Sequence, residues 1–310
     1  MRACNHQWLI AARTPYADPL GELPSGKLRV RPSVIDDFGM PVSSYPLYRT
    51  ESKVSDFEMT RACPGGAPSS YDAACGDWVV NTAQPSSPPY NTTNANARFM
   101  PLIDDDVYPN IGDRLSDAGI SWAWYAGGWD QVNSDPSKVP QFQFHHQPFL
   151  YFEDYAPGTP GRAHLRDSEE FVAAAKAGAL PTVSFVKPYA SENEHPGYAS
   201  EPLGSANLVE LVRAVVEGGS AGNTLVVVTY DEFGGQWDHV SPPTGDAWGP
   251  GTRIPAMVIG RSLTRSGVDH TRYDTTSILA TIERSFGLEP LGTRDASVND
   301  LAAAVAAGGR

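Results

Sequence analysis

The sequence is poor in cysteine and in basic residues, and it contains no long apolar run. Only three of its 310 residues are Cys, and 23 Lys and Arg stand against 36 Asp and Glu, so the formal net charge is -13. This balance argues against nucleic acid or an anionic membrane surface as the main partner, because both bind basic faces. No apolar run approaches the about 20 residues that a membrane-spanning helix needs. The sequence therefore predicts no integral membrane segment.

Several familiar catalytic motifs are also absent. The chain has no Gly-x-Ser-x-Gly elbow, no Walker loop, no Cys-x-x-Cys pair and no His-Glu-x-x-His helix. Serine hydrolases, nucleoside triphosphatases and zinc proteases therefore lack support. A phosphorylated small molecule stays open as a partner, because a bound metal or a local Arg cluster can invert the field of an acidic chain.

The three cysteines leave the redox state of the protein open. Cys63 and Cys75 flank a Gly-, Pro- and Ser-rich loop, so a disulfide between them in an oxidising compartment is one interpretation, and it leaves Cys4 over. Three free thiols are the alternative. The N-terminus shows no long apolar core followed by a small-residue cleavage site, so no signal peptide is visible there.

Glycine and proline are frequent, and they predict a large share of loop. The chain has 29 Gly and 27 Pro, and the polar stretch 15–102 is interrupted by them throughout. Long loops in a compact enzyme commonly carry binding or capping roles. We interpret 15–102 as a loop-rich excursion over the surface of one domain that covers 1–310.

Apolar patterns elsewhere predict helices that alternate with strands. The expected helices are 5–12, 111–119, 168–177, 205–217 and 275–286, and the expected strands are 120–125, 182–186, 224–230 and 254–259. The run 224–230 is continuously apolar and β-branched, which is typical of a strand buried on both faces of a parallel sheet. The fold class is therefore α/β, with a mostly parallel sheet covered by helices on both faces. Ligands of such sheets bind beyond the carboxyl ends of the strands.

Asp231 and Glu232 directly follow the most apolar of these strands. Two adjacent carboxylates at the mouth of a hydrophobic strand are unfavourable unless positive charge neutralises them. A divalent metal with carboxylate ligands is one interpretation. A solvated turn that caps the strand is the other, and the dipeptide alone does not decide between them.

Histidines gather near other expected strand ends. His195 follows the strand 182–186 by a few residues, and His145 and His146 lie between aromatic residues, where they could bind a metal or an anionic oxygen. Asp238 and His239 follow the Asp231 segment and are weaker candidates. Each His alone could be an ordinary surface residue, but four of the seven His fall in these segments.

Several segments, taken together, resemble the bacterial phosphoesterase family that includes acid phosphatase A and the non-haemolytic phospholipases C. The matching segments are Asn5-His-Gln-Trp-Leu-Ile-Ala-Ala12, 111–122, Asn193-Glu-His-Pro196, Thr229-Tyr-Asp-Glu-Phe-Gly-Gly-Gln-Trp-Asp-His-Val-Ser-Pro-Pro243 and Tyr273-Asp-Thr-Thr-Ser-Ile278. They follow the family's order across nearly the whole chain. The resemblance implies an alkaline-phosphatase-like α/β fold with long surface loops.

The resemblance also implies roles for individual residues. Asp231 and Glu232 would be ligands of a divalent metal of unknown identity. His195 would contact the phosphoryl group as an acid or a charge stabiliser, and His146, with His145 beside it, would line the phosphate pocket. These roles suit phosphoryl transfer, which needs in-line positioning and positive charge against the phosphoryl oxygens.

The sequence departs from the family pattern at its beginning. The family carries a metal-binding Glu-Asn pair on a first strand upstream of Asn5, and its Ser or Thr nucleophile lies three residues before the matching Asn. That position holds Arg2, and arginine cannot serve as a phosphorylatable nucleophile. We therefore expect an N-terminally incomplete member that lacks the first strand, with a gap in its sheet.

The expected function is hydrolysis of phosphate esters, by an acid-phosphatase-like phosphomonoesterase or a phospholipase C-like phosphodiesterase. The monoesterase is favoured because the segment 5–12 resembles the phosphatase branch. The partner would be a phosphorylated small molecule or a phospholipid head group. A relative that binds metal and phosphate without turnover is the alternative. By the same resemblance, the full-length protein would be periplasmic or secreted.

Overall fold

The computed structural model of the chain describes the following residues, and the structural statements below refer to them. They are 5–13, 32–35, 47–50, 60–61, 76–80, 87–89, 102–103, 105–106, 108–139, 142–197, 199–243 and 250–309. Arg2 and all three cysteines lie outside this set, so the nucleophile position and the Cys63–Cys75 disulfide stay predictions.

The protein is a mixed α/β structure in which most of the expected elements are present. The helices are α1 (Asn5–Ala11), α2 (Ile111–Asp117), α3 (Trp129–Ser134), α4 (Ser168–Ala177), α5 (Glu201–Val216), α6 (Ser277–Phe286), α7 (Thr293–Ser297) and α8 (Ala302–Ala307). The strands after residue 100 are β5 (Trp122–Ala126), β6 (Leu165–Asp167), β7 (Val183–Lys187), β8 (Val226–Thr229) and β9 (Ala256–Ile259). All five expected helices and all four expected strands are confirmed, with shifts of a few residues at their ends.

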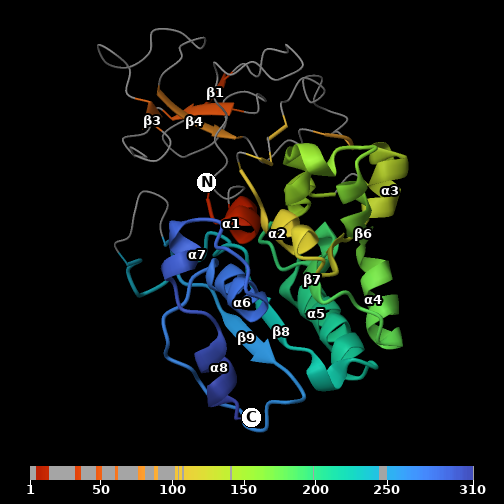
Figure 1. The fold of residues 1–310 in the computed structure, drawn as a ribbon, viewed down its shortest axis with the longest axis vertical. Helices are drawn as coiled ribbons and strands as arrows, with labels where there is room; N and C mark the ends of the chain where they lie inside the picture. Colours follow the sequence, from red (N-terminus) through yellow and green to blue (C-terminus); the bar gives the residue numbers. More distant parts are fainter. Residues whose placement is uncertain are drawn as a thin grey trace.

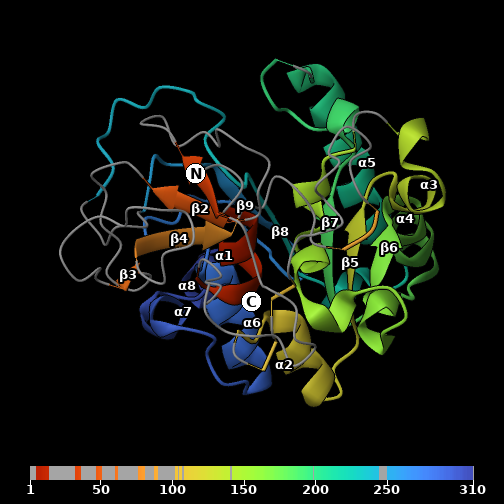
Figure 2. The ribbon, with the colours of Figure 1, turned by 90° about the horizontal axis from the view of Figure 1, so that it is seen from above.

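A three-stranded sheet in the order β6-β5-β7 forms the centre of the fold, and all of its strands run parallel. The register aligns Trp122 of β5 with Val183 of β7, and Ala126 with Lys187. The carboxyl ends of these two strands therefore meet at one edge of the sheet. Figures 1 and 2 show this sheet beside α4 and α5.

Strand β5 is buried on both faces, because each face meets a different layer. Trp122 and Trp124 point into a large core that includes α1, α2 and the 3-10 turn η5 (Pro148–Tyr151). Ala123 and Tyr125 point to the other side, where they pack against α4 and α5. All five residues of β5 are accordingly buried. Helices on both faces are confirmed for this sheet.

Strand β8 differs from its expectation. It pairs antiparallel with β9, with Val226 opposite Ile259 and Thr229 opposite Ala256, and its four residues are all partly exposed. The prediction of a strand buried on both faces of a parallel sheet is therefore wrong for β8. Its valines do pack inward in part, since Val226 lies against the α4–α5 core together with Val186 of β7.

Most of the stretch 15–102 lies outside the described residues, but four short strands within it are described. They are β1 (Pro32–Ile35), β2 (Leu47–Thr50), β3 (Thr60–Arg61) and β4 (Gly76–Val80), in the order β1-β2-β4-β3. Figure 1 shows them above α1, apart from the central sheet. The boundaries of the excursion stay a prediction.

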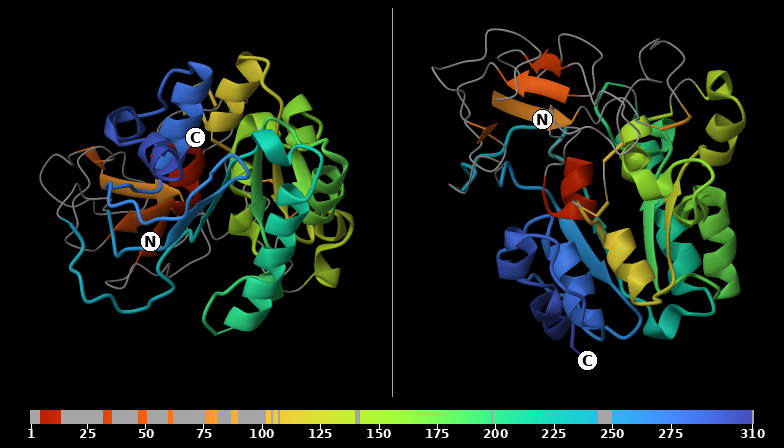
Figure 3. Two further views of the ribbon diagram at one scale, coloured as in Figure 1. Left: turned by 90° about the horizontal axis from the view of Figure 1, so that it is seen from below. Right: turned by 45° about the horizontal axis from the view of Figure 1, so that its top comes forward.

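The C-terminal helices form the layer opposite α4 and α5. In Figure 3 the elements α6, α7 and α8, drawn in blue, lie on the far side of β8 and β9 from α5. Helix α1 contacts both α2 and α6, so it connects the helix before β5 with the C-terminal helices. No helix among the described residues is long and apolar enough to cross a membrane.

Candidate active site

Helix α1 brings a histidine that the sequence analysis assigned no role into contact with the residues after β8. His6 is 2% exposed, and its Nε2 lies 3.0 Å from Oδ2 of Asp231. The contact is close, but neither ring nitrogen has a well-aligned hydrogen bond. The neighbouring Asn5 donates from Nδ2 to the backbone oxygen of Asp231 at 3.0 Å. Two successive residues of α1 are therefore fixed to the end of β8.

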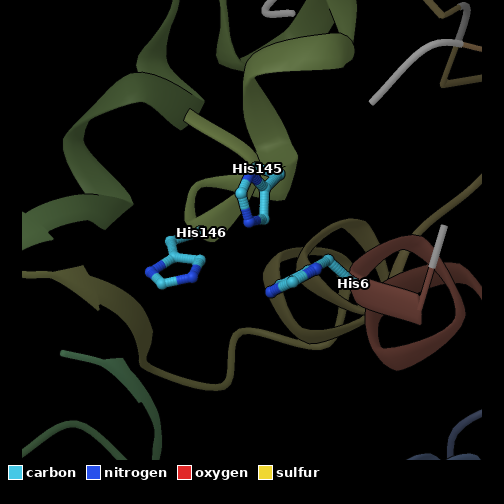
Figure 4. Close-up of side chains that lie close together, drawn as sticks. All are labelled: His6, His145 and His146. Atoms are coloured by element: carbon cyan, nitrogen blue, oxygen red, sulfur yellow. The ribbon is translucent and has the colours of Figure 1, made fainter. Parts of the chain in front are cut away.

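His145 and His146 face His6 from the 3-10 turn η4 (Phe144–His146). Figure 4 shows the three imidazoles converging from the two elements. The ring centroid of His6 lies 5.1 Å from that of His145 and 5.5 Å from that of His146. One nitrogen from each ring lies within 4.8 Å of the others, which is close enough for a shared ligand.

The turn that carries these histidines is held in place by backbone contacts. The indole Nε1 of Trp124 donates to the backbone oxygen of His146 at 2.7 Å. Nδ1 of His146 lies 3.3 Å from the backbone oxygen of Pro188, directly after β7. Gln7 of α1 donates to the backbone oxygen of Pro148 at 3.1 Å. The histidine cluster thus lies at the carboxyl edge of β7, where α/β sheets bind ligands.

Burial makes the histidine cluster electrically neutral. Burial is the main cause that lowers the pKa of His145 to about 3 and the pKa of His146 well below its ordinary value. Burial and the charge of Lys187 also lower the pKa of His6, although Asp231 opposes them. A neutral imidazole presents one N–H donor and one lone pair, so each ring can donate to an anionic oxygen or coordinate a metal.

Asp231 lies between this cluster and a lysine. The Nζ of Lys187, the last residue of β7, is 3.3 Å from Oδ2 of Asp231. Burial alone would raise the pKa of Asp231, but Lys187 and His6 outweigh it and hold that pKa well below its usual range. Asp231 is therefore a carboxylate at all ordinary pH values, and it is available to a cation.

Glu232 points to a different neighbour. Its side chain is 7% exposed, its Oε2 accepts a hydrogen bond from Gly234 N at 2.8 Å, and its Oε1 lies 4.0 Å from Nε2 of His195. Gly234 has a φ of +62°, a backbone conformation that favours glycine, so the turn that provides this N–H depends on it. His195 is also fixed by the backbone oxygen of Pro196, 2.8 Å from its Nδ1.

The two weaker candidates lie outside this group. The carboxylate of Asp238 accepts two hydrogen bonds from the guanidinium of Arg253, at 2.7 and 2.8 Å. His239 is 74% exposed and lies 3.6 Å from Asp238. The structure thus connects Asp238 with the segment before β9.

Asp231, Glu232 and the histidine cluster offer donors that suit a divalent metal, and the three histidines are the group whose ligand atoms converge. Two carboxylates from adjacent residues offer oxygen ligands, and His6 offers a buried nitrogen 3.0 Å from Asp231. Such mixed oxygen and imidazole sets match hard and borderline divalent cations. A second acidic group, Asp105, Asp113 and Asp154, also gathers three carboxylate oxygens. The carboxylates of Asp105 and Asp113 accept hydrogen bonds from Asn110, Tyr155 and the backbone N–H of Asp154, so they stabilise the start of α2.

The sequence profile of the phosphoesterase family matches residues 3–289. The chain belongs to the phosphoesterase family. It is also 29% identical over 262 residues to Phospholipase C A of Mycobacterium tuberculosis, an alignment that covers 73% of this chain and 48% of that protein. The match to the Phosphatidylinositol-3-phosphatase of the same species is 27% identical and covers 67% of this chain and 64% of the relative.

Similar identities connect the chain with phosphatases and phospholipases alike. A probable acid phosphatase of Kluyveromyces lactis is 23% identical over 262 residues, with 74% of this chain and 59% of the relative covered. The chain thus spans about half the length of the first phospholipase C relative and less than two thirds of the others named here. Family membership supports a hydrolase of phosphoric esters, as the resemblance of Asp231-Glu232 and its neighbours predicted.

Neither His6 nor Lys187 was assigned a role from the sequence, although both contact Asp231. His6 lies in a short polar trio, Asn5-His6-Gln7, that begins an otherwise apolar helix. Three consecutive polar residues at the start of an apolar helix were the signal in the sequence that could have indicated a functional role for His6. Lys187 was visible as the residue that ends an apolar strand, but a lysine in that place is commonly solvated.

Proposed function

We propose that this protein hydrolyses phosphoric esters, with a phosphomonoester preferred to a phosphodiester. The observation that carries the proposal is the meeting of Asp231, three neutral imidazoles and Lys187 at the carboxyl edge of β7, in a chain that belongs to the phosphoesterase family. A phosphate group needs N–H donors and positive charge around its oxygens, and this edge provides both. The ligand would be a phosphorylated small molecule or a phospholipid head group.

The proposal assigns each residue a task. Asp231 and Glu232 hold a divalent cation, and such a metal, when bound, supplies Lewis-acid charge to the phosphoryl oxygens. His145 and His146 donate hydrogen bonds from uncharged rings. His195, which is one third exposed, lies beside Glu232 and serves as the acid or charge stabiliser. Asp238 and His239 stay the weaker candidates, since Asp238 is paired with Arg253 and His239 lies beside Asp238.

The proposed architecture is an alkaline-phosphatase-like fold in one phosphoesterase domain over 1–310. The parallel sheet β6-β5-β7 with helices on both faces supports it, and so does the family match over 3–289. The antiparallel pair β8-β9 is a separate sheet among the described residues, and it lies against the same α4–α5 core.

A second candidate is a relative that binds metal and phosphate but turns nothing over. The observation in its favour is Arg2, which stands where the family places its Ser or Thr nucleophile. A guanidinium remains protonated and cannot be phosphorylated in the reaction. The donor set around Asp231 would still bind ligands in such a protein.

One assay separates the two candidates. The purified chain is titrated with divalent metals and assayed on p-nitrophenyl phosphate and on p-nitrophenyl phosphorylcholine. Turnover supports the hydrolase and shows that Arg2 does not occupy an essential nucleophile position. Metal and phosphate binding without turnover supports the binding protein, and the absence of both would contradict the proposed site.

We further propose, from the family resemblance alone, that the full-length protein is periplasmic or secreted. Fractionation of the native cells, followed by immunodetection with an antibody against this chain, tests the location. Recovery only from the cytoplasmic fraction would contradict export.

A further inference from the structure

Lys187 brings an ammonium group to the proposed site. Its side chain is 15% exposed, and its ammonium group lies 3.3 Å from Oδ2 of Asp231. The same carboxylate oxygen contacts Nε2 of His6 at 3.0 Å. Lys187 and the histidine cluster thus share one anionic neighbour, and the charge of Lys187 acts on all three rings.

The backbone fixes where this ammonium group can reach. Lys187 ends β7 in register with Ala126, and its backbone oxygen accepts a hydrogen bond from Gly127 at 3.0 Å. The next residue, Pro188, contacts the ring of His146 through its backbone oxygen. The lysine therefore starts from a hydrogen-bonded strand end, and its flexible side chain can leave Asp231 for another anionic oxygen within reach.

We propose that Lys187 exchanges partners at this site: it neutralises Asp231 when no metal is bound, and it binds a phosphoryl oxygen when a divalent cation occupies Asp231. This inference rests on the proposed function. It goes beyond that proposal by naming a phosphate-binding residue and by making Lys187 a competitor of the metal.

Electrostatics supports the exchange. An ammonium group and a divalent cation repel each other across one carboxylate, so binding of the cation weakens the hold of Asp231 on Lys187. A phosphate dianion beside neutral imidazoles lacks a full positive charge from those rings, and Lys187 provides one. The lysine then has a partner in both states, as a largely buried charge requires.

The exchange predicts that replacing Lys187 changes the affinities for the metal and for phosphate in opposite directions. Lys187→Met removes the competitor and leaves Asp231 without its ammonium partner, so the affinity for Mn²⁺ should rise severalfold. The same substitution removes a charged hydrogen bond to phosphate, which is commonly equivalent to about tenfold or more in affinity. Inorganic phosphate should therefore bind about tenfold more weakly to the Mn²⁺-loaded variant.

Isothermal titration calorimetry on the full chain tests both signs without an activity assay. Mn²⁺ is titrated into the metal-free protein, and inorganic phosphate is then titrated into the Mn²⁺-loaded protein. Lys176→Met is the matched control, because Lys176 is an exposed lysine on α4. It should change neither affinity, and Lys187→Arg, which keeps the charge, should stay closer to the wild type than Lys187→Met in both titrations.

The outcomes separate this inference from the proposed function. If the wild-type chain binds neither Mn²⁺ nor phosphate, the proposed function is overturned, and the exchange with it. If the wild type binds both and Lys187→Met leaves phosphate affinity unchanged or weakens Mn²⁺ binding, only the exchange is overturned. Circular dichroism checks the fold of the variant, and Lys187→Gln replaces it in the same titrations if Lys187→Met does not fold.

Discussion

Two aspartates seven residues apart have opposite surroundings. Asp231 contacts the largely buried ammonium group of Lys187 and the buried imidazole of His6. Asp238 accepts two hydrogen bonds from Arg253, whose side chain is 57% exposed. The burial of the basic partner, rather than the residue type, therefore distinguishes a candidate ligand from a structural carboxylate.

Asp231→Asn should weaken Mn²⁺ binding by at least about tenfold, since even the loss of an outer-shell partner of a metal ligand commonly has that effect. The amide keeps the size of the side chain but loses the negative charge. Calorimetric titration measures the change, and Asp238→Asn is the control that should retain wild-type affinity. Equal losses in both variants would argue against Asp231 as the specific ligand.

Glu283 carries a buried carboxyl group away from the site. It is 2% exposed on α6, and burial, followed by the hydrogen bond and charge of Asp295, raises its pKa to about 8. Asp295 is itself fully buried and accepts hydrogen bonds from the backbone N–H groups of Leu291 and Gly292. Arg284 opposes the shift only weakly. Glu283 therefore holds a proton near neutral pH.

This proton makes stability depend on pH with a defined sign. Between the ordinary carboxyl pKa of 4.5 and about 8, the folded protein keeps a proton that the unfolded chain releases. Stability should therefore fall as pH rises through that window. Glu283→Gln should reduce the difference between urea midpoints measured near each end of the window. Glu289→Gln, at an exposed position, should leave the wild-type difference intact, and an unchanged difference in Glu283→Gln would contradict the assignment.

At the scale of elements, α4 is fixed by its first residues. Asp167 precedes the helix and accepts hydrogen bonds from Glu169 N at 3.1 Å and from Asp130 N at 3.0 Å. The second bond reaches α3, so one largely buried carboxylate connects two helices. The helix itself ends at Gly178, whose φ of +70° provides the left-handed C-cap.

Asp167→Ala should destabilise the protein by about 1–3 kcal/mol, from a lost N-cap and an N–H group left without its acceptor. Urea unfolding at neutral pH measures the free energy of unfolding. Asp135→Ala is the comparison, because that partly exposed aspartate caps a short 3-10 turn. We expect less than about 0.5 kcal/mol there. Equal effects would show that the link to Asp130 contributes nothing.

The elements were largely predictable from the sequence, because their signals are local. Apolar periodicity located α2, and the continuous β-branched run 224–230 located β8. The pairing of β8 was not predictable, since an apolar run does not reveal whether its neighbour runs parallel or antiparallel. The site was predictable in part: Asp231 and His195 follow strands, but His6 reaches Asp231 from a position more than 200 residues away in the chain.

At the scale of the whole molecule, the site joins parts of the chain that are distant in sequence. Asp231, His146 and His6 come from three segments that are far apart in the sequence but meet in the fold. A ligand that binds all three therefore stabilises their arrangement as well as the site. Ligand binding and folding are linked through mass action.

Saturating Mn²⁺ should raise the thermal midpoint by a few degrees, since ligand at 100 times its dissociation constant adds about 2.7 kcal/mol. Scanning fluorimetry with and without the metal measures the shift, and phosphate should raise it further in the metal-loaded protein. Asp231→Asn should show little of the metal effect. A shift of the same size in that variant would place the stabilising metal elsewhere.

Helix α1 makes three successive side-chain contacts: Asn5 and His6 to Asp231, and Gln7 to the backbone of Pro148. A helix of seven residues is too short to be stable by itself in water. The helical conformation of α1 therefore depends on these contacts and on the core residues against which it packs. Unwinding of its first turn would remove His6 from the imidazole cluster, so retention of a bound ligand and the hydrogen-exchange protection of the first amides of α1 are two measures of the same equilibrium.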